Sequence, residues 1–412
     1  MPKRQFTGSF TQQEPISEAG IAAAVAVLQS GRLHRYNTLE GEIAETAHLE
    51  CEFAAYQTTR YCLACTSGGY ALHIALRAFG LTFGEPVLTN AFTLSPVPGA
   101  IHNAGGRPVL VETTQDLVVD LDDLEQKIVA SGSRVFLISH MRGHLVDMEA
   151  LMALLGRHGV ALIEDCAHTM GAEWRGQKSG SFGIIGCFST QTYKHINSGE
   201  GGFITTNDAE LMARAVILSG SYMLYEQHLA GPAPELYADI RLDTPNYSGR
   251  MDNVRAAILR PQLGELDRNV TRWNERYRII EQTLNLVDGV YTPERPPEEH
   301  FVGSSIQFLI PGISAQRARD FVAACRKRGV ELKWFGAEEP VGYTSRHQSW
   351  RYLERQPLPR TDAVLNELFD MRIPLTFSID NCLLIGQIIV ECYDPLGSQA
   401  NRQTSDCRES FR

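Results

Sequence analysis

Residues 134–168 read RVFLISHMRGHLVDMEALMALLGRHGVALIEDCAH and decide the fold class. Two short apolar runs, Arg134–Ser139 and Val160–Glu164, have the length and residue types of buried strands. Between them, Met148–Leu155 has the apolar spacing of a helix. A strand, a helix and a second strand in this order favour parallel strands joined by a helical crossover, which is the unit of the α/β class.

The same alternation continues on both sides of this stretch. Further apolar runs predict strands over 61–65, 86–89, 108–111, 184–188 and 202–206. Helical spacing indicates helices over 17–29, with Ser17 as the cap, over a segment around 49–56 and over 72–79. We therefore expect a mainly parallel sheet that is covered by helices on both faces.

The pattern changes near residue 260. Long helical patterns cover roughly 251–266 and 268–286, and a strand, a helix and a strand are then expected over 304–310, 315–328 and 330–334. We predict two domains, a large one over 1–260 and a smaller C-terminal α/β domain over 261–412. Residues 397–412 are polar, and we expect them to be loosely ordered.

The composition is that of a folded, acidic protein. Of 412 residues, 43% are hydrophobic, and 38 basic against 48 acidic side chains give a formal net charge of −10. These values exclude disordered and fibrous classes and disfavour nucleic-acid binding. The longest apolar stretches fall well short of the ~20 residues of a membrane span, and the first residues lack the apolar region of a signal peptide. We expect a cytoplasmic protein with no nucleic-acid or membrane partner.

The nine cysteines suggest reduced thiols rather than a disulfide framework. Cys62 and Cys65 form the one C-x-x-C pair, but no second Cys or His pair follows at zinc spacing. Structural cysteines are therefore favoured over a metal or redox site, and we expect no metal. No Gly-x-Gly-x-x-Gly follows a strand and opens a helix, which disfavours a dinucleotide-dependent oxidoreductase.

The candidate catalytic and binding residues follow predicted strands. Asp165 ends a buried strand, where open α/β sheets place their ligands, and Lys194 lies between a strand and a glycine turn. Ser67-Gly68-Gly69 precedes a helix, so its amides can bind a phosphate. A lysine, a carboxylate and small-residue turns are what pyridoxal phosphate (PLP) requires, for a Schiff base, for the protonated ring nitrogen and for the phosphate.

These motifs resemble the DegT/StrS-like sugar aminotransferases, a family of fold-type-I PLP enzymes. The resemblance is close over about 31–263 and weaker beyond, and it rests on six motifs in the family's order: Ile163–His168, Phe188–Gly202, Ser67–His73, Ala91–Leu94, Ser139–Met148 and Asn246–Ala257. It implies a large domain with a mostly parallel seven-stranded sheet between helices, plus a smaller α/β domain. It also implies PLP as the cofactor.

The resemblance implies three catalytic residues. Lys194 would form the Schiff base and move the substrate proton, and Asp165 would pair with the ring nitrogen. His168 would lie against the ring or support Asp165. A surface lysine, a helix-capping aspartate and a structural histidine are the respective alternatives. Family members with histidine in place of this lysine are dehydratases, so Lys194 favours amino transfer.

The resemblance also implies the cofactor-binding set. Gly68 and Gly69 would supply amides to the phosphate and Ser189 a hydroxyl, although a plain turn into a helix is the alternative for the glycines. Leu94 stands where the family has a ring-stacking aromatic, and Phe92 is the alternative. Asn246 would reach the phosphate of the partner subunit. The alternative is Ser248, which takes the place of the family's asparagine when the sequences are matched without a gap.

The activity implied is transfer of an amino group from a small-molecule donor, glutamate or glutamine, to a keto acceptor, within a homodimer with shared active sites. A nucleotide-linked ketosugar is the expected acceptor, with a keto-cyclitol or another secondary-metabolite ketone as the alternative. A non-catalytic PLP-binding regulatory protein is the alternative of another class. Acceptor contacts are expected in the loops 33–40, 221–243 and 334–350. There, Trp334, Arg346 and His347 are the candidate contact residues, and a simple solvated loop is the alternative.

Overall fold

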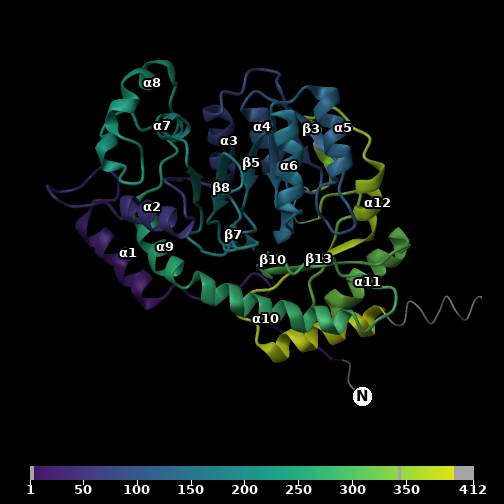
Figure 1. The fold of residues 1–412 in the computed structure, drawn as a ribbon. Coiled ribbons are helices and arrows are strands. Elements are labelled where there is room, and N and C mark those ends of the chain that lie inside the picture. Colours follow the sequence, from purple (N-terminus) through teal and green to yellow (C-terminus); the bar gives the residue numbers. More distant parts are fainter. Residues whose placement is uncertain (1–3, 342–344, 394–412) are drawn as a thin grey trace, which may run out of the picture.

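The structure is a computed structural model that describes residues 4–341 and 345–393 (Figure 1). Its central sheet has seven strands in the order β1-β9-β8-β5-β4-β2-β3. Their bounds are β1 Tyr61–Cys65, β2 Pro86–Asn90, β3 Arg107–Val111, β4 Val135–Ser139, β5 Ala161–Asp165, β8 Ile185–Ser189 and β9 Gly202–Thr206. All neighbours pair in parallel except β9, which is antiparallel to β1 and β8. The mostly parallel α/β sheet is confirmed.

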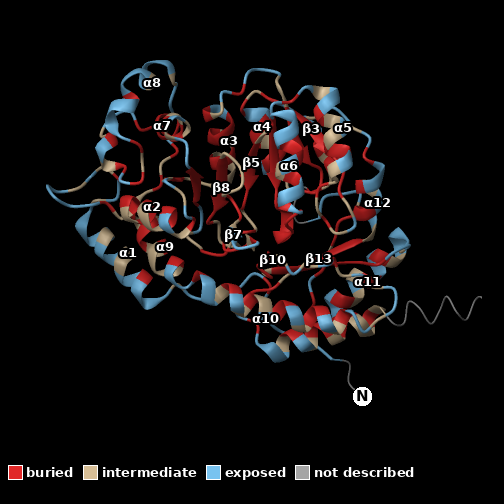
Figure 2. Ribbon diagram, in the orientation of Figure 1, coloured by how far each residue is buried: buried red, intermediate tan, exposed pale blue. Residues whose placement is uncertain are grey.

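Helices cover both faces of this sheet. One face packs against α2 Glu45–Tyr56, α5 Leu121–Ser131 and α6 Met148–His158, and the other against α3 Gly68–Ala78, α4 Pro96–Asn103 and α7 Ala209–Leu218. Within β4, Phe136 and Ile138 point to the first face, whereas Val135 and Leu137 point to the second. Both faces of the sheet are therefore covered by apolar cores, and Figure 2 shows the strands as mostly buried.

The helix α1, Glu18–Ser30, begins at the capping residue expected from the sequence, because Ser17 Oγ accepts a hydrogen bond from Gly20 N at 3.2 Å. It packs on α9, Asn253–Gly264. The apolar side chains Ile21, Val25 and Leu28 stay exposed on it.

Both outer strands of the central sheet are covered by other parts of the chain. On β3, the Gln356 side chain accepts from Leu110 N at 2.8 Å and donates to Pro108 O at 3.1 Å, as a neighbouring strand would. On β1, Cys62 N donates to Ala230 O at 3.0 Å. Backbone groups at both edges of the sheet are thus hydrogen-bonded within the chain.

The C-terminal part has its own sheet, here called the C-terminal sheet, in the order β11-β13-β12. It consists of β11 Ser305–Leu309, β13 Leu368–Arg372 and β12 Lys333–Trp334, all antiparallel, and packs with α10 Leu266–Leu284 and α11 Ala315–Lys327. The expected strand, helix and strand are present, but the two strands are not neighbours. The sequence analysis missed β13, which lies between them, because its apolar and polar residues alternate over only five positions.

The remaining elements are short or peripheral. They are β6 Glu173–Trp174, β7 Gln177–Lys178, β10 Glu299–His300, α8 Tyr237–Asp243, α12 Pro359–Glu367, the 3-10 turns η1 Met141–Gly143, η2 Tyr225–Gln227, η3 Pro234–Leu236 and η4 His347–Ser349, and a helix over 379–393. Among the helices of the described residues, none combines the length and the apolar character that crossing a bilayer requires.

The N-terminal residues pack with the C-terminal sheet. Phe6 and Phe10 lie edge-on against Phe377, with ring centroids 5.0 and 4.9 Å away. The domain boundary near residue 260 stays a prediction, and the expectation for 397–412 lies outside the described residues.

Cys62 and Cys65 are both buried on β1 but face opposite sides of the sheet, one in each of its two cores. The two thiols therefore cannot join in one site. Burial raises the pKa of the Cys65 thiol to about 12.

Candidate active site

A cavity of about 350 Å³ opens where β4, β5 and β8 end and α3 begins. It brings together seven of the eight residues that the sequence singles out, drawn from five separate segments: Gly68, Gly69, Leu94, Asp165, His168, Ser189 and Lys194. Parallel strands place their carboxyl ends at one edge of a sheet, which explains why residues so distant in sequence meet here.

Lys194 lies in the turn region after β8, where its own backbone N donates to Gln191 O at 2.8 Å. Its Nζ is 2.8 Å from His168 Nε2. The other ring nitrogen of His168, Nδ1, accepts from Arg142 N at 3.3 Å. The lysine amine is therefore held in one place before any ligand arrives.

The charges around Lys194 favour its neutral form. The pKa of Lys194 is lowered to about 7, first by burial and then by the nearby guanidinium groups of Arg142 and Arg372, against the attraction of Asp165. Burial and the charge of Lys194 hold the pKa of His168 well below its usual range.

The hydrogen-bond pattern agrees with these charges. A backbone N–H can only donate, so Nδ1 of His168 is an acceptor and the neutral ring carries its proton on Nε2. This proton then points to the lone pair of the Lys194 amine. An unprotonated, oriented amine is what a nucleophilic lysine requires.

Asp165 is buried at the end of β5. Its Oδ2 accepts from Ser139 Oγ at 2.9 Å, and its Oδ1 accepts from Ala167 N at 3.1 Å. The residues that follow form turns rather than a helix, so the helix-capping alternative does not hold. The carboxylate is fixed on the cavity wall.

The start of α3 and the end of β8 approach each other closely. Ser67 caps α3 by accepting from Tyr70 N at 3.1 Å. A Cβ built on Gly68 would lie 2.7 Å from the Ser189 Cβ, so only glycine permits this approach. The first amides of a helix have no partner within it, and here they face the same cavity as Ser189. This arrangement suits a phosphate.

Leu94 lies on the cavity wall, whereas Phe92 does not. Phe92 is fully buried in another cluster, where its ring centroid is 5.4 Å from that of Phe335. Of the two, Leu94 is the one placed to cover a ligand.

A sequence profile of the DegT/DnrJ/EryC1/StrS aminotransferase family matches residues 15–381. The chain belongs to this family. The family depends on PLP. The cavity fits that cofactor, because a neutral lysine, a fixed carboxylate and free helix amides share its wall.

Two curated relatives of the family illustrate its range. A protein of Geobacillus stearothermophilus named pleiotropic regulatory protein is 33% identical over 234 residues, which cover 56% of this chain and 58% of that protein. The dTDP-3-amino-3,4,6-trideoxy-alpha-D-glucose transaminase of Streptomyces venezuelae is 33% identical over 278 residues, 67% of this chain and 66% of that protein. The chain thus matches less than two thirds of the length of both relatives.

A solved structure of 3-amino-5-hydroxybenzoic acid (AHBA) synthase shares the fold. It superimposes with a TM-score of 0.81 at 22% identity, covering 95% of this chain and 100% of that one.

Asn246 is the one predicted site residue outside the cavity. It and Ser248 are both exposed, and the Ser248 hydroxyl accepts from Arg250 Nη2 at 2.8 Å. Neither side chain reaches the cavity of its own chain.

The loop residues singled out for acceptor contacts are engaged elsewhere. Trp334 is buried and its Nε1 donates to Asn366 O at 2.7 Å, and Arg346 Nη1 donates to Gly336 O at 3.0 Å. His347 Nε2 lies 2.9 Å from Asp362 Oδ1.

Two site residues were missed by the sequence analysis. Ser139, which donates to Asp165, ends β4 directly opposite Asp165 in the parallel register. Its place at the end of a predicted strand was the signal that could have identified it. Arg142 has a left-handed backbone with φ of 59°, which is uncommon outside glycine, and its Nη2 donates to Asp370 Oδ2 at 2.6 Å. Nothing in the local sequence indicates a partner so distant along the chain.

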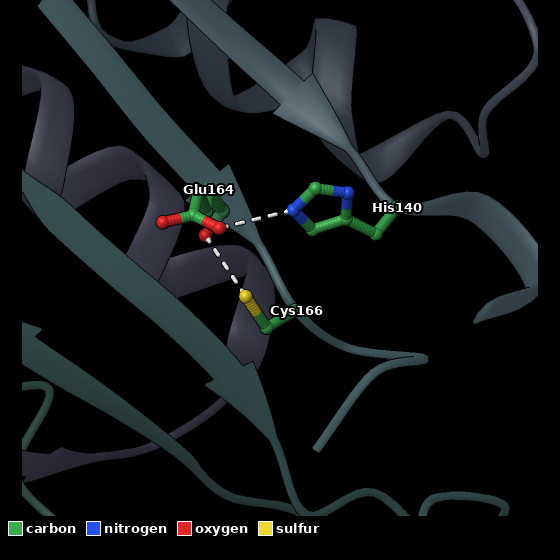
Figure 3. Close-up of side chains that lie close together, drawn as sticks. All are labelled: His140, Glu164 and Cys166. Atoms are coloured by element: carbon green, nitrogen blue, oxygen red, sulfur yellow. Dashed lines mark hydrogen bonds and ion pairs between the residues drawn. The ribbon is translucent and has the colours of Figure 1, made fainter. Parts of the chain in front are cut away.

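His140, Glu164 and Cys166 form a buried cluster of metal-ligand types next to the site, with one ligand atom of each within 4.8 Å of the others (Figure 3). The Glu164 carboxylate is already engaged by His140 Nε2 at 3.1 Å and by the backbone N–H groups of Gly180, Phe182 and Gly183 at 2.9, 2.8 and 2.7 Å. Its role is to fix the turn before β8.

Proposed function

We propose that the chain is a PLP-dependent aminotransferase that moves an amino group from glutamate or glutamine to the carbonyl of a small molecule, a nucleotide-linked ketosugar. The observation that carries the proposal is the 2.8 Å contact between the Lys194 amine and His168 in a cavity that also holds Asp165. The Streptomyces venezuelae relative, which is named as a dTDP-aminosugar transaminase, supports the acceptor class.

The cofactor-binding roles follow from the cavity. We assign the phosphate to the amides of Gly68 and Gly69 and to the Ser189 hydroxyl, the ring nitrogen to Asp165, and the ring face to Leu94 and His168. When bound, PLP supplies an electron sink for the negative charge that develops on the substrate carbon.

The chain's own residues then have three tasks. Lys194 would hold the cofactor covalently, and its freed Nζ would carry the proton between the substrate carbon and the cofactor's C4′ carbon. Asp165, oriented by Ser139, keeps a negative charge at the ring nitrogen. His168 orients the Lys194 amine by donating to it. An amine whose pKa lies near 7 suits proton transfer in both directions at neutral pH.

The test uses the absorbance of the purified protein. We expect a band at ~420 nm, as for PLP bound to a lysine, that disappears when glutamate or glutamine is added. Lys194→Ala should lack both the band and turnover, while Lys327→Ala, which removes an exposed lysine on α11, should keep both.

The outcomes separate the alternatives. A band that no amino acid bleaches would instead support the non-catalytic regulatory protein. Turnover in Lys194→Ala would disprove the assignment of this lysine. A screen in which candidate amines are added to the PLP form measures the reverse reaction, in which the product amine gives up its amino group. The amine that reacts therefore shows whether the product is an aminosugar or an aminocyclitol.

We further propose a homodimer with shared active sites, in the cytoplasm. The exposed apolar side chains Ile21, Val25 and Leu28 on α1 support an interface, and Asn246 lies outside the cavity of its own chain. A mixture of Lys194→Ala and Asn246→Leu chains tests the sharing. Each variant is inactive alone, and a mixed dimer recovers one intact site, whereas no recovery would contradict the role of Asn246.

A further inference from the structure

The turn η1, Met141–Gly143, holds the histidine that orients Lys194. Arg142 N in this turn donates to His168 Nδ1 at 3.3 Å, and the opposite ring nitrogen of His168 lies 2.8 Å from the Lys194 amine. The reactive amine is therefore one imidazole ring away from the backbone of Arg142. The placement of that backbone sets which nitrogen of His168 carries the proton.

The backbone of Arg142 adopts a conformation that a residue with a side chain rarely takes. Its φ of 59° and ψ of 19° lie in the left-handed region, where the Cβ atom approaches the following carbonyl oxygen too closely. Such a conformation persists only where surrounding contacts hold it. In this chain, those contacts come from the C-terminal part.

A buried ion pair fixes the side chain of this arginine. Arg142 Nη2 donates to Asp370 Oδ2 at 2.6 Å, and the two side chains are only 6% and 3% exposed. Asp370 lies on β13, 228 residues further along the chain. Separating the pair would leave two buried charges without compensation, so the pair resists any rotation of the arginine.

The C-terminal sheet in turn immobilises Asp370. Gln307, its register partner on β11, donates from Nε2 to Asp370 Oδ1 at 2.7 Å. The Oε1 atom of Gln307 accepts from His144 Nε2 at 2.8 Å, which binds the residue after the turn to the same sheet. Lys333, the register partner on β12, faces Asp370 as a second cation beside Arg142. The carboxylate therefore has fixed donors on both of its oxygens.

The last residue of the turn leaves little room for movement. A Cβ built on Gly143 would lie 3.1 Å from His168 O and 3.3 Å from Val302 O, so two backbone segments press against this glycine. Gly143 O also accepts from Arg295 Nη1 at 2.6 Å. A shift of Arg142 would therefore pass to His168 rather than be absorbed within the turn.

We propose that Asp370 is a positioning residue for Lys194. Its ion pair holds Arg142 in the conformation whose backbone N–H keeps the proton of His168 on Nε2. This inference rests on the proposed function and adds to it a residue that lies outside the cavity. Without the ion pair, the backbone of Arg142 relaxes and its N–H leaves Nδ1. The proton of His168 then moves to Nδ1, and the Lys194 amine loses the donor that orients it.

The first test locates the proton of His168 in the full-length holoenzyme. Nitrogen NMR spectra of histidine-labelled protein separate protonated from unprotonated ring nitrogens, and the spectrum of His168→Asn identifies the signals of this residue. At neutral pH, we expect an unprotonated Nδ1 in the unchanged protein and a protonated Nδ1 in Asp370→Asn. The control is Asp320→Asn, which removes an exposed carboxylate on α11 and should leave Nδ1 unprotonated.

A matched pair of double variants separates positioning from packing. Both contain Asp370→Leu, and the charge of Arg142 is removed with its partner, by Arg142→Gly in the glycine variant and by Arg142→Val in the valine variant. Glycine adopts a left-handed backbone without an anchor, whereas a β-branched residue does not. We expect an unprotonated Nδ1 in the glycine variant alone. Its kcat should exceed that of the valine variant about 10- to 100-fold at similar KM, because a misplaced amine slows the chemistry rather than binding.

The outcomes decide the role of Asp370. An unprotonated Nδ1 in both Asp370→Asn and the valine variant would overturn the proposal, and so would equal kcat values in the glycine and valine variants. If Asp370→Asn does not fold, the double variants still give the answer, because neither contains an unpaired arginine at position 142. The spectra need no amino transfer, so they test the positioning of His168 even if the proposed function fails.

Discussion

His168 Nε2 and the Lys194 amine are 2.8 Å apart, and above pH 7 the neutral histidine donates its Nε2 proton to the neutral amine. The direction of this hydrogen bond follows from Arg142 N, which occupies the other ring nitrogen. The lysine is consequently reactive without the help of a separate base.

This pair predicts the pH dependence of Lys194 labelling. In protein freed of PLP, acetylation of Lys194 by acetic anhydride should rise with an apparent pKa of about 7 rather than near its ordinary 10.5. The rate falls as the pH drops below 7, because protonation removes the lone pair. Arg372→Gln removes a positive charge and should move the profile to higher pH. Mass spectrometry of the labelled peptide checks this, and a profile like that of a free lysine peptide would contradict it.

The carboxylate of Asp165 should matter through its charge rather than its shape. Asp165→Asn keeps the volume and one oxygen, but we expect turnover to fall about 10²- to 10³-fold. Ser139→Ala removes only the orienting hydroxyl, so a loss of about 10-fold is expected. Steady-state kinetics at saturating PLP give both values. Equal losses in the two variants would mean that orientation, not charge, is decisive.

The buried ion pair between Arg35 and Glu50 should be critical for stability. Their side chains are 1% and 0% exposed, and two hydrogen bonds of 2.7 and 2.8 Å join them. Glu50→Leu leaves the guanidinium buried without its partner, which should cost about 3–5 kcal/mol of the free energy of unfolding. The double variant Arg35→Met/Glu50→Leu should recover most of that loss. Denaturant titration measures both, and a double variant no better than the single one would refute the argument.

The exposed face of α1 should be needed for assembly. Val25 is 42% exposed between Ile21 and Leu28 on a helix whose other side packs on α9. If the proposed dimer forms through this face, Val25→Glu should shift the protein from dimer to monomer in sedimentation velocity while its circular dichroism stays unchanged. Val129→Glu makes the same change at an exposed site on α5 and serves as the control.

The strands that are buried on both faces were predictable from the sequence. Strands such as β4 and β5 are apolar on both faces, so their sequences stand out, and the motif residues Asp165 and Lys194 follow from their position after such strands. β13 was not predictable in this way, since its polar residues Asp370 and Arg372 contact other parts of the chain. Their partners, Arg142 and Tyr193, lie far away in the sequence, and no local pattern encodes such pairs.

The closed edges of the central sheet have a consequence for the chain in crowded solution. Gln356 beside β3 and Ala230 beside β1 occupy hydrogen-bonding positions that a foreign strand would use. A foreign strand would have to displace these hydrogen bonds, so the chain's own contacts oppose amyloid-like growth from the central sheet.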